Sequence, residues 1–481
     1  ICGSENVLDD SEALAAYAED HSFAEPKAPT CIARPGSAEQ VQRIVRWACD
    51  TGTPLIPVSS GAPHFRGDTV PTAENAVIVD LSGMDRIIRI DRRNRVAMIE
   101  PGVTFAQLQE ALGREGMRIA MPLLPRRTKS VLASCLEREP TTLPAYHWDY
   151  PDPLLCPEII FGTGELMRGG DAAGVGTIEE QWEAGGAQKC PMGPFQLDYF
   201  RWVSGAQGTM GIVTWSSVKC ELLPRRDKTF IIPAQRLEDL IDFAYSILRR
   251  RLGYEFLLLN DLDLAVILEE GTDDVGGLRE SLPPWSLIVS LGGLDRHPEE
   301  RIAYQEQQLI DFASQNSLQL KTGLPGVSGR RVLEALRNPS PEPYWKLRPK
   351  GGCHDLFFLT TLDKVPAFLE AMREQAEMAG YPPGDMGIYI QPLVQGASCH
   401  CEFNLYCDPS NAKEVERVRK LLDSAIDVLM DRGAYFSRPY GIWADSVYAR
   451  NEIHTDYLRK LKDIVDPKNI MNPGKLCFAR R

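Results

Sequence analysis

Residues 54–67 read PLIPVSSGAPHFRG, an apolar run that ends in a loop of small residues. A short apolar run bounded by turn-forming residues is typical of a buried β-strand, which we expect over Pro54 to Ser59. Gly61, Pro63 and Gly67 then interrupt any regular structure. Small residues allow backbone N–H groups to approach a phosphate closely. Taken alone, the stretch fits either an ordinary tight loop or a pyrophosphate-binding loop.

Regular elements are expected on both sides of this loop. Apolar residues at helical spacing predict a helix over 38–49, and an apolar run predicts a strand over 76–81. Alternating residues over 87–100 predict a hairpin, and Thr104 is expected to cap a helix over 105–115. Further strands are expected at 158–161, 165–168 and 212–223. The first part of the chain therefore mixes helices and strands.

From about Arg225 the pattern becomes a repeat of strand and helix. The expected strands are 229–232, 285–291, 357–361 and 387–391, and the expected helices are 237–251, 299–316, 365–378 and 414–432. We expect a second sheet with helices on one side. Because 481 residues exceed one ordinary core, the sequence predicts two large domains of the α+β class.

Composition excludes several classes of protein. The formal net charge is −13 and basic residues are dispersed, which argues against nucleic-acid binding. No apolar run approaches the roughly 18 residues of a membrane span. Residues 1–23 lack the basic-then-apolar order of a signal peptide. The twelve cysteines form no CxxC pair, which favours a cytoplasmic location.

Cys399, His400 and Cys401 are the most concentrated group of metal-binding residue types. Alternate residues of a strand point to opposite faces, so the two cysteines share one side and His400 faces away. Such an arrangement makes a poor chelate. We therefore expect no metal site.

Three motifs in a fixed order carry a family resemblance. The loop 56–71, the turn 99–104 (IEPGVT) and the tail 465–475 (VDPKNIMNPGK) resemble the vanillyl-alcohol oxidase/p-cresol methylhydroxylase (PCMH-type) superfamily of FAD flavoproteins. The resemblance runs nearly end to end. It implies an FAD-dependent oxidoreductase, a homo-oligomer of at least two chains, and oxygen or a redox partner protein as electron acceptor. It also implies a two-part PCMH-type FAD-binding domain over 1–225, an α+β cap domain with an antiparallel sheet over 226–435, and a segment 436–481 that returns to the FAD domain.

Further motifs resemble the branch of this superfamily that oxidises phenols. They are LERE at 136–139, PAYHW at 144–148, GELMR at 164–168 and CPMGP at 190–194. The branch that oxidises 2-hydroxy acids carries a metal-binding histidine run where this chain has QPLVQG at 391–396. The resemblance thus favours a small aromatic alcohol or para-alkylphenol as substrate. The alternatives are a 2-hydroxy-acid dehydrogenase and, because the loop is poor in glycine, a non-catalytic or electron-relaying subunit.

The resemblance also assigns residues to the cofactor. It implies FAD contacts from Ser59, Ser60, Gly61, Ala62, Pro63, His64, Phe65, Ser130, Glu137, Gly205, Gly211, Ile212, Val213 and Lys475. Pro63 removes one N–H donor from the loop. His64 lies one place after the histidine that bonds the flavin in some members, so non-covalent FAD is favoured. The alternative is a covalent link through His400, where the phenol branch can carry a cap-domain histidine.

Arg438 matches the arginine with which phenol oxidisers hold the substrate phenolate. A fixed guanidinium stabilises that anion while hydride leaves the para substituent for flavin N5. Tyr440 is expected beside the substrate. The family's two phenolate-binding tyrosines correspond to Arg66 and Ser437, and two arginines suit a carboxylate equally well. The resemblance further gives a proton-handling role to Tyr146 or Asp149, with His400 as another catalytic candidate.

Overall fold

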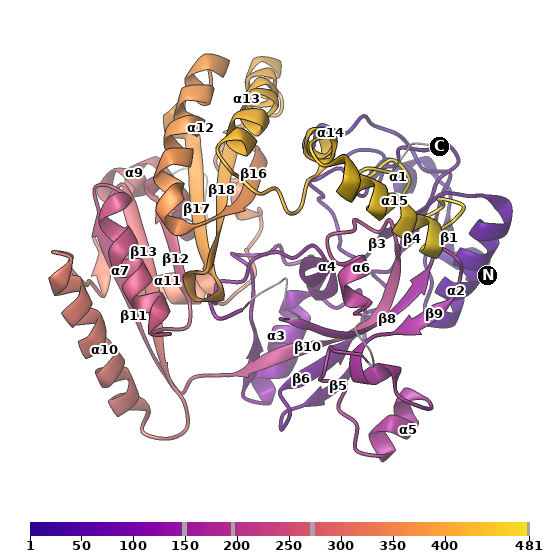
Figure 1. Ribbon diagram of the computed structural model, residues 1–481, viewed down its shortest axis with the longest axis horizontal. Coiled ribbons are helices and arrows are strands. Elements are labelled where there is room, and N and C mark those ends of the chain that lie inside the picture. The colour runs from indigo at the N-terminus through magenta and orange to yellow at the C-terminus, as the bar shows by residue number, and fades with distance from the viewer. Residues whose placement is uncertain (147–151, 194–197, 270–274, 479–481) are drawn as a thin grey trace.

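The computed structural model describes residues 1–146, 152–193, 198–269 and 275–478. Its elements form two lobes (Figure 1). One lobe holds two sheets and both ends of the chain, and the other holds a single six-stranded sheet with most of the long helices.

The first sheet has the strand order β1-β2-β4-β3. Its strands are β1 (Val7–Leu8), β2 (Cys31–Ala33), β3 (Leu55–Val58) and β4 (Val77–Asp80), of which β2, β4 and β3 run parallel. Helix α2 (Ala38–Thr51) connects β2 to β3, and its buried Val41, Ile44, Val45 and Ala48 pack on the sheet. A short helix, α1 (Ser11–Ala15), precedes β2. The loop after β3 therefore leaves the carboxyl edge of a parallel sheet, where ligands commonly bind.

The second sheet is antiparallel and has the order β5-β6-β10-β8-β9, with β7 also paired to β10. The strands are β5 (Ile87–Asp91), β6 (Val96–Ile99), β7 (Met117–Ile119), β8 (Leu154–Phe161), β9 (Leu166–Arg168) and β10 (Gly211–Leu222). Helices α3 (Phe105–Arg114), α4 (Val131–Leu136), α5 (Ile178–Glu183) and α6 (Phe200–Val203) belong to this part. The predicted hairpin is confirmed, and Thr104 caps α3 in a reciprocal pair with Gln107.

The third sheet is antiparallel throughout, with the order β11-β13-β12-β17-β18-β16. Its strands are β11 (Arg226–Ala234), β12 (Phe256–Asn260), β13 (Trp285–Gly293), β16 (Gly352–Thr360), β17 (Met386–Leu393) and β18 (Ser398–Cys407). The small hairpin of β14 (Gly323–Leu324) and β15 (Val327–Ser328) lies beside β11.

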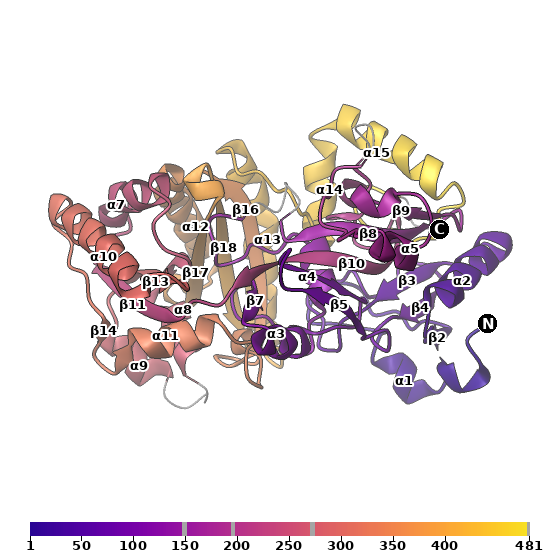
Figure 2. The ribbon, with the colours of Figure 1, turned by 90° about the horizontal axis from the view of Figure 1, so that it is seen from below.

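Helices cover both faces of this sheet, so the prediction of helices on one side is wrong (Figure 2). One face packs against α7 (Glu238–Arg249), α10 (Pro298–Gln315), α12 (Val365–Ala379) and α13 (Ala412–Asp431). The other packs against α8 (Asp261–Leu268) and α11 (Gly329–Leu336), with α9 (Val275–Ser281) beside α8. Helix α8 is buried on all sides and lacks the polar stripe that marks a surface helix in sequence.

The two lobes are joined where β10 ends at Leu222 and β11 begins at Arg226. After α13 the chain returns to the first lobe through α14 (Gly441–Ala449) and α15 (Glu452–Val465) (Figure 1). Met471 bridges to Leu55 of β3 and is buried in the core beneath α2. On this path we propose domain boundaries near residues 225 and 435.

All twelve cysteines are free thiols. On β18, Cys399 and Cys401 are buried in the core that lies beneath α12 and α13. His400 points to the opposite face, as the alternation of a strand predicts. Within the part of the chain that the structure describes, no helix is both long and apolar enough to span a bilayer.

Candidate active site

Arg438 lies almost completely buried between the two lobes and contacts a residue of each. Its guanidinium stacks on Phe357 of β16, 4.3 Å from the ring centroid. Nη1 donates to the carbonyl oxygen of Glu137 at 3.2 Å, and Nη2 lies 3.5 Å from His400 Nδ1. Nε donates to no described residue. A buried donor of this kind calls for an acceptor that another molecule supplies.

Arg66 brings a second guanidinium to the same aromatic ring. Its Cζ lies 5.0 Å from the centroid of Phe357 and 5.1 Å from that of Tyr440. Nη1 pairs with Glu137 at 2.9 Å, and Nη2 lies 3.6 Å from Asp355. The sequence-predicted substrate residues Arg66, Arg438 and Tyr440 are thus brought together.

Tyr440 and Arg438 each carry a buried donor that lacks an acceptor in the described part of the chain. The buried Tyr440 hydroxyl, like Arg438 Nε, has no partner in the described ranges. Burial lowers the pKa of Arg438 to about 10, with the charge of Arg66 acting in the same direction. Arg438 therefore stays protonated at neutral pH. The arrangement favours an oxyanion as ligand.

His400 lies beside Arg438 in a defined tautomer. Its Nε2 is 3.0 Å from Glu402 Oε2, and Lys346 donates to Glu402 Oε1 at 2.8 Å. Arginine only donates, so Nδ1 faces Arg438 as the acceptor and Nε2 carries the proton. Burial lowers the pKa of His400, against the opposing effect of Glu402. His400 is therefore a neutral imidazole at pH 7.

The acidic and basic partners of this cluster were missed in the sequence. Lys346 donates to both Glu402 and Asp355, and Asp355 in turn lies near Arg66. Glu402 alone had a sequence signal, because it lies two residues beyond His400 on the same face of β18.

The loop from Ser59 to Gly67 keeps backbone donors available. Ser60 Oγ accepts from the amide of Ser130 at 3.0 Å, and the amide of Gly61 donates to Thr128. The amide of Gly67 donates to Asp20. The loop's remaining N–H groups donate to no other residue that the structure describes. Free backbone N–H groups in this loop suit an anion.

Two cations beside this loop were also missed. Arg126 Nη1 donates to the carbonyl oxygen of Gly61 at 2.7 Å, and its Cζ lies 5.5 Å from the centroid of Phe65. Lys129 pairs with Glu137 at 2.6 Å and is nearly buried. Their only signal was the basic run at 126–129 inside an irregular segment. Together they add positive charge where a pyrophosphate would lie.

Two hollows adjoin the loop. A polar one of about 120 Å³ is lined by residues that include Ser60, His64, Phe65, Arg66, Arg126, Lys129 and Glu139. An apolar one of about 110 Å³ is lined by residues that include Val58, Leu81, Leu132, Gly211, Ile212 and Val213. Ser59 and Glu137 line both. The apolar hollow suits an adenine ring, and the loop between the two suits a pyrophosphate.

The residues therefore fit the chemistry of FAD, with one steric requirement. Cavities for drug-sized ligands measure roughly 300–1,000 Å³, and the two hollows together are smaller. Glu137 lines both hollows and holds Arg66 and Lys129 in ion pairs. Those side chains must turn aside to admit a cofactor as long as FAD.

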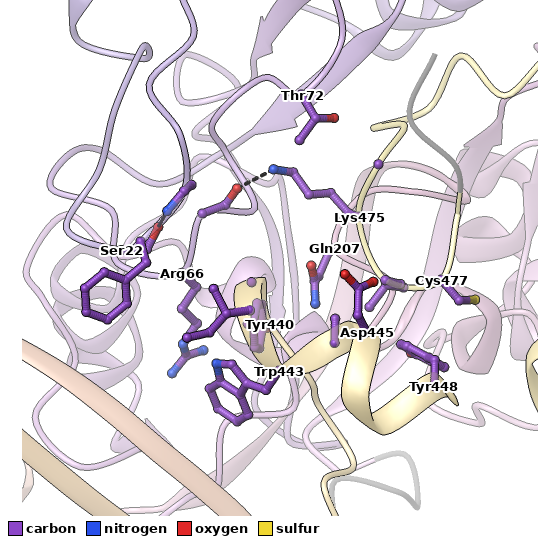
Figure 3. A pocket seen from close by; sticks show the side chains of 18 of the residues that line it. Ser22, Arg66, Thr72, Gln207, Tyr440, Trp443, Asp445, Tyr448, Lys475 and Cys477 are labelled. Carbon is purple, nitrogen blue, oxygen red and sulfur yellow. Dashed lines mark hydrogen bonds between the residues drawn. The ribbon is translucent and has the colours of Figure 1, made fainter. Parts of the chain in front are cut away.

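Other predicted residues lie farther from this cluster. Lys475 Nζ donates to the carbonyl oxygens of Gly67 at 2.5 Å and Val70 at 2.8 Å, so the tail holds the segment after the loop (Figure 3). Gly205 has a positive φ of 71°, its amide donates to Leu136, and it lines neither hollow.

Tyr146 is not part of the Arg438 cluster. Its hydroxyl donates to Glu221 of β10 at 2.5 Å, and Lys219 Nζ lies 4.5 Å from its ring centroid. Burial raises the pKa of Tyr146, as does Glu221, so the phenol stays protonated. Asp149, the alternative proton-handling residue, lies outside the described residues.

Comparisons with known proteins agree with this geometry. A family model described as an FAD binding domain matches residues 29–131, and one described as the C-terminal domain of FAD linked oxidases matches residues 360–476. The chain is 25% identical to D-2-hydroxyglutarate dehydrogenase of Stutzerimonas stutzeri, over 98% of this chain and 96% of that protein.

Two solved structures share the fold over nearly the whole chain. p-Cresol methylhydroxylase with bound substrate superposes with a TM-score of 0.83 at 18% identity, covering 99% of this chain and 95% of that one. 4-Ethylphenol oxidase from Gulosibacter chungangensis in complex with isoeugenol gives 0.82 at 20% identity, covering 100% and 95%. The chain thus carries matches to the FAD binding domain and to the C-terminal domain of FAD linked oxidases, shares the fold of PCMH-type enzymes, and is an FAD-dependent oxidoreductase.

Proposed function

We propose that this enzyme dehydrogenates a small aromatic alcohol or a para-alkylphenol, whose phenolate oxygen is held by Arg438. The observation that carries the proposal is the pair of buried donors, Arg438 Nε and the Tyr440 hydroxyl, that have no acceptor within the described chain. Both lie beside Phe357, so the surroundings of the two donors are aromatic. A phenolate supplies the missing negative charge and the flat ring.

The chain's own groups favour the ionised form of a phenol. Arg438 and Arg66 place two positive charges beside the bound oxygen, which lowers the pKa of a phenol there. As the phenolate pushes electrons into the ring, hydride leaves the para substituent and a quinone methide forms. Bound FAD supplies the hydride acceptor. The quinone methide then takes up water or loses a proton.

A second candidate function is the dehydrogenation of a 2-hydroxy acid. Two guanidinium groups on one aromatic ring also suit a carboxylate, which arginine binds through two parallel hydrogen bonds. The full-length similarity to D-2-hydroxyglutarate dehydrogenase supports this alternative. Against it stands Gln391, the first residue of the stretch that carries metal-binding histidines in that branch. Its side-chain oxygen accepts from the Tyr389 hydroxyl, and its Nε2 donates to two backbone carbonyl oxygens.

Anaerobic reduction of the bound flavin separates the two candidates. We expect 4-hydroxybenzyl alcohol to bleach the flavin absorbance near 450 nm and D-lactate or D-2-hydroxyglutarate to leave it unchanged. Bleaching by the hydroxy acids alone would reject the phenol proposal in favour of the second candidate.

We expect acid precipitation to release the flavin into the supernatant, because FAD is held without a covalent bond. The ring nitrogens of His400 are already directed at Glu402 and Arg438, so a bond to the flavin would cost a buried hydrogen bond. The measurement is the flavin absorbance of pellet and supernatant, before and after protease digestion. Flavin that stays with the peptide containing His400 would contradict the expectation.

A further inference from the structure

A large cleft lies on the far side of Arg66 from the polar hollow. Its volume is about 980 Å³. Its walls include the N-terminal residues 22–25, the start of the α14 region at 440–445 and the tail at 474–478, together with residues 65–67 (Figure 3). Phe65, Arg66 and Asp355 line both this cleft and the polar hollow. Arg66 therefore stands at the boundary between the two spaces.

The cleft is far larger than the proposed substrates need. Cavities of roughly 300–1,000 Å³ hold drug-sized ligands, whereas 4-hydroxybenzyl alcohol has a single ring. Its walls are rich in aromatic side chains: Phe23, Phe65, Tyr440, Trp443, Tyr448 and Phe478. Charges of both signs lie among them, including Arg419, Arg459, Asp445 and Asp456. Aromatic faces interspersed with charges of both signs suit a ring-containing body without a required net charge.

The N-terminal wall of the cleft is fixed to both lobes. Phe23 stacks on His354 of β16, with ring centroids 4.1 Å apart and planes 8° from parallel. His21 stacks on Phe65, and Asp20 accepts the amide hydrogen of Gly67 at 2.6 Å. These contacts hold the wall in place between the Ser59–Gly67 loop and the third sheet. The cleft is therefore a preformed space.

We infer that the cleft is a subsite for the body of an extended aryl substrate, so that the enzyme's substrate class is phenols with a bulky group beside the oxygen. The inference rests on the proposed function. In this arrangement the phenolate oxygen lies between Arg438 and Arg66, and a group on the ring carbon ortho to it extends past Arg66 into the cleft. A group para to the oxygen points away from the cleft.

The test compares three phenols that differ only in the place of a second ring. Isothermal titration of the FAD-containing enzyme measures the dissociation constants of phenol, 2-phenylphenol and 4-phenylphenol. Burying an added ring against aromatic walls strengthens binding, so we expect 2-phenylphenol to bind at least about tenfold tighter than phenol. We expect 4-phenylphenol to gain less.

Two variants that fill the cleft, called filling variants here, and a matched control test whether the cleft causes the tighter binding of 2-phenylphenol. Ala24→Phe adds a ring to the wall formed by the N-terminal segment, Ala444→Phe adds one to the wall formed by α14, and Ala184→Phe adds one at the exposed end of α5. We expect each filling variant to remove the gain of 2-phenylphenol over phenol while the control keeps it. Because Ala24 lies outside regular structure, its variant tests the inference even if Ala444→Phe fails to fold.

Failure of this inference can be told apart from failure of the proposed function, because the titrations measure binding and need no turnover of the phenol. A gain that disappears in the filling variants supports the subsite even if phenols do not bleach the flavin. Equal affinities for phenol and 2-phenylphenol, or a gain that survives Ala24→Phe, would overturn the inference.

Discussion

Replacement of Arg438 by alanine is expected to lower kcat/KM for a phenolic substrate by about 10²- to 10³-fold, the usual effect of removing one preorganised donor that stabilises developing charge. Arg438 is buried on Phe357 and its Nε has no other partner in the described chain. The variant leaves Arg66 as the remaining guanidinium at the ring. Steady-state kinetics over a range of pH measure the effect.

The pH profile separates a role in binding the anion from a structural role. With Arg438 present, the bound phenol ionises below its solution pKa, so activity that depends on the phenolate begins at lower pH. In Arg438→Ala the pH at which activity rises should move toward the pKa of the free phenol. Arg438→Lys should recover part of the activity. Arg432→Ala, an exposed arginine paired with Glu374, is the matched control. Activity of Arg438→Ala within a few-fold of the parent would contradict the assignment.

Replacement of Glu255 by alanine is expected to destabilise the fold by about 3–5 kcal/mol, the cost of leaving buried charge without its partner. Glu255 is fully buried next to β12 and binds Arg118 of β7, Arg337 and Ser290. Arg337 also pairs with Asp227 of β11 at 2.8 Å. The carboxylate thus links the second sheet to the third, and its loss leaves Arg118 without a counter-ion. Urea unfolding of parent and variant measures the difference.

The contribution of Glu255 depends on pH in a defined direction. Burial alone would raise the pKa of this carboxyl, but Arg118 and Arg337 hold it well below its usual value. A lowered folded-state pKa stabilises the protein above the unfolded-state pKa of about 4.3, and the stabilisation is lost as the pH falls below that value. The gap between parent and variant should therefore shrink in acid.

An exposed ion pair provides the control for this substitution. Glu299 pairs with Arg226 at 3.1 Å, and both side chains are about two-thirds exposed. Exposed pairs contribute roughly 0–1 kcal/mol, so Glu299→Ala should change stability little. Equal effects of the two substitutions would contradict the role given to Glu255.

Local patterns predicted the elements near the Ser59–Gly67 loop well. Helix α2, strands β3 and β4, the β5–β6 hairpin and the Thr104 cap follow from apolar spacing, alternation and capping chemistry, which act over a few residues. Helix α8 was not predicted, because a helix buried on all sides shows no polar face in its sequence. Helix α11, on the same face of the third sheet, is amphipathic but only eight residues long, and it was not predicted either.

Only part of the candidate site could be predicted from the sequence. Arg438, Arg66 and Tyr440 were reached through their motifs, and the structure brings them together. Lys346 and Asp355 were not predicted. Their partners, Glu402 and Arg66, lie 56 and 289 positions away in the chain. Only the folded sheet brings such residues into contact, and no local spacing records it.

The most direct test of the account compares two substrates that differ only in whether the phenol can ionise. Anaerobic stopped-flow absorbance follows flavin reduction by 4-hydroxybenzyl alcohol and by 4-methoxybenzyl alcohol. An enzyme that holds a phenolate at Arg438 should be reduced by the first and at least about 10²-fold more slowly by the second, which cannot form the anion. Equal rates with both alcohols would contradict the account.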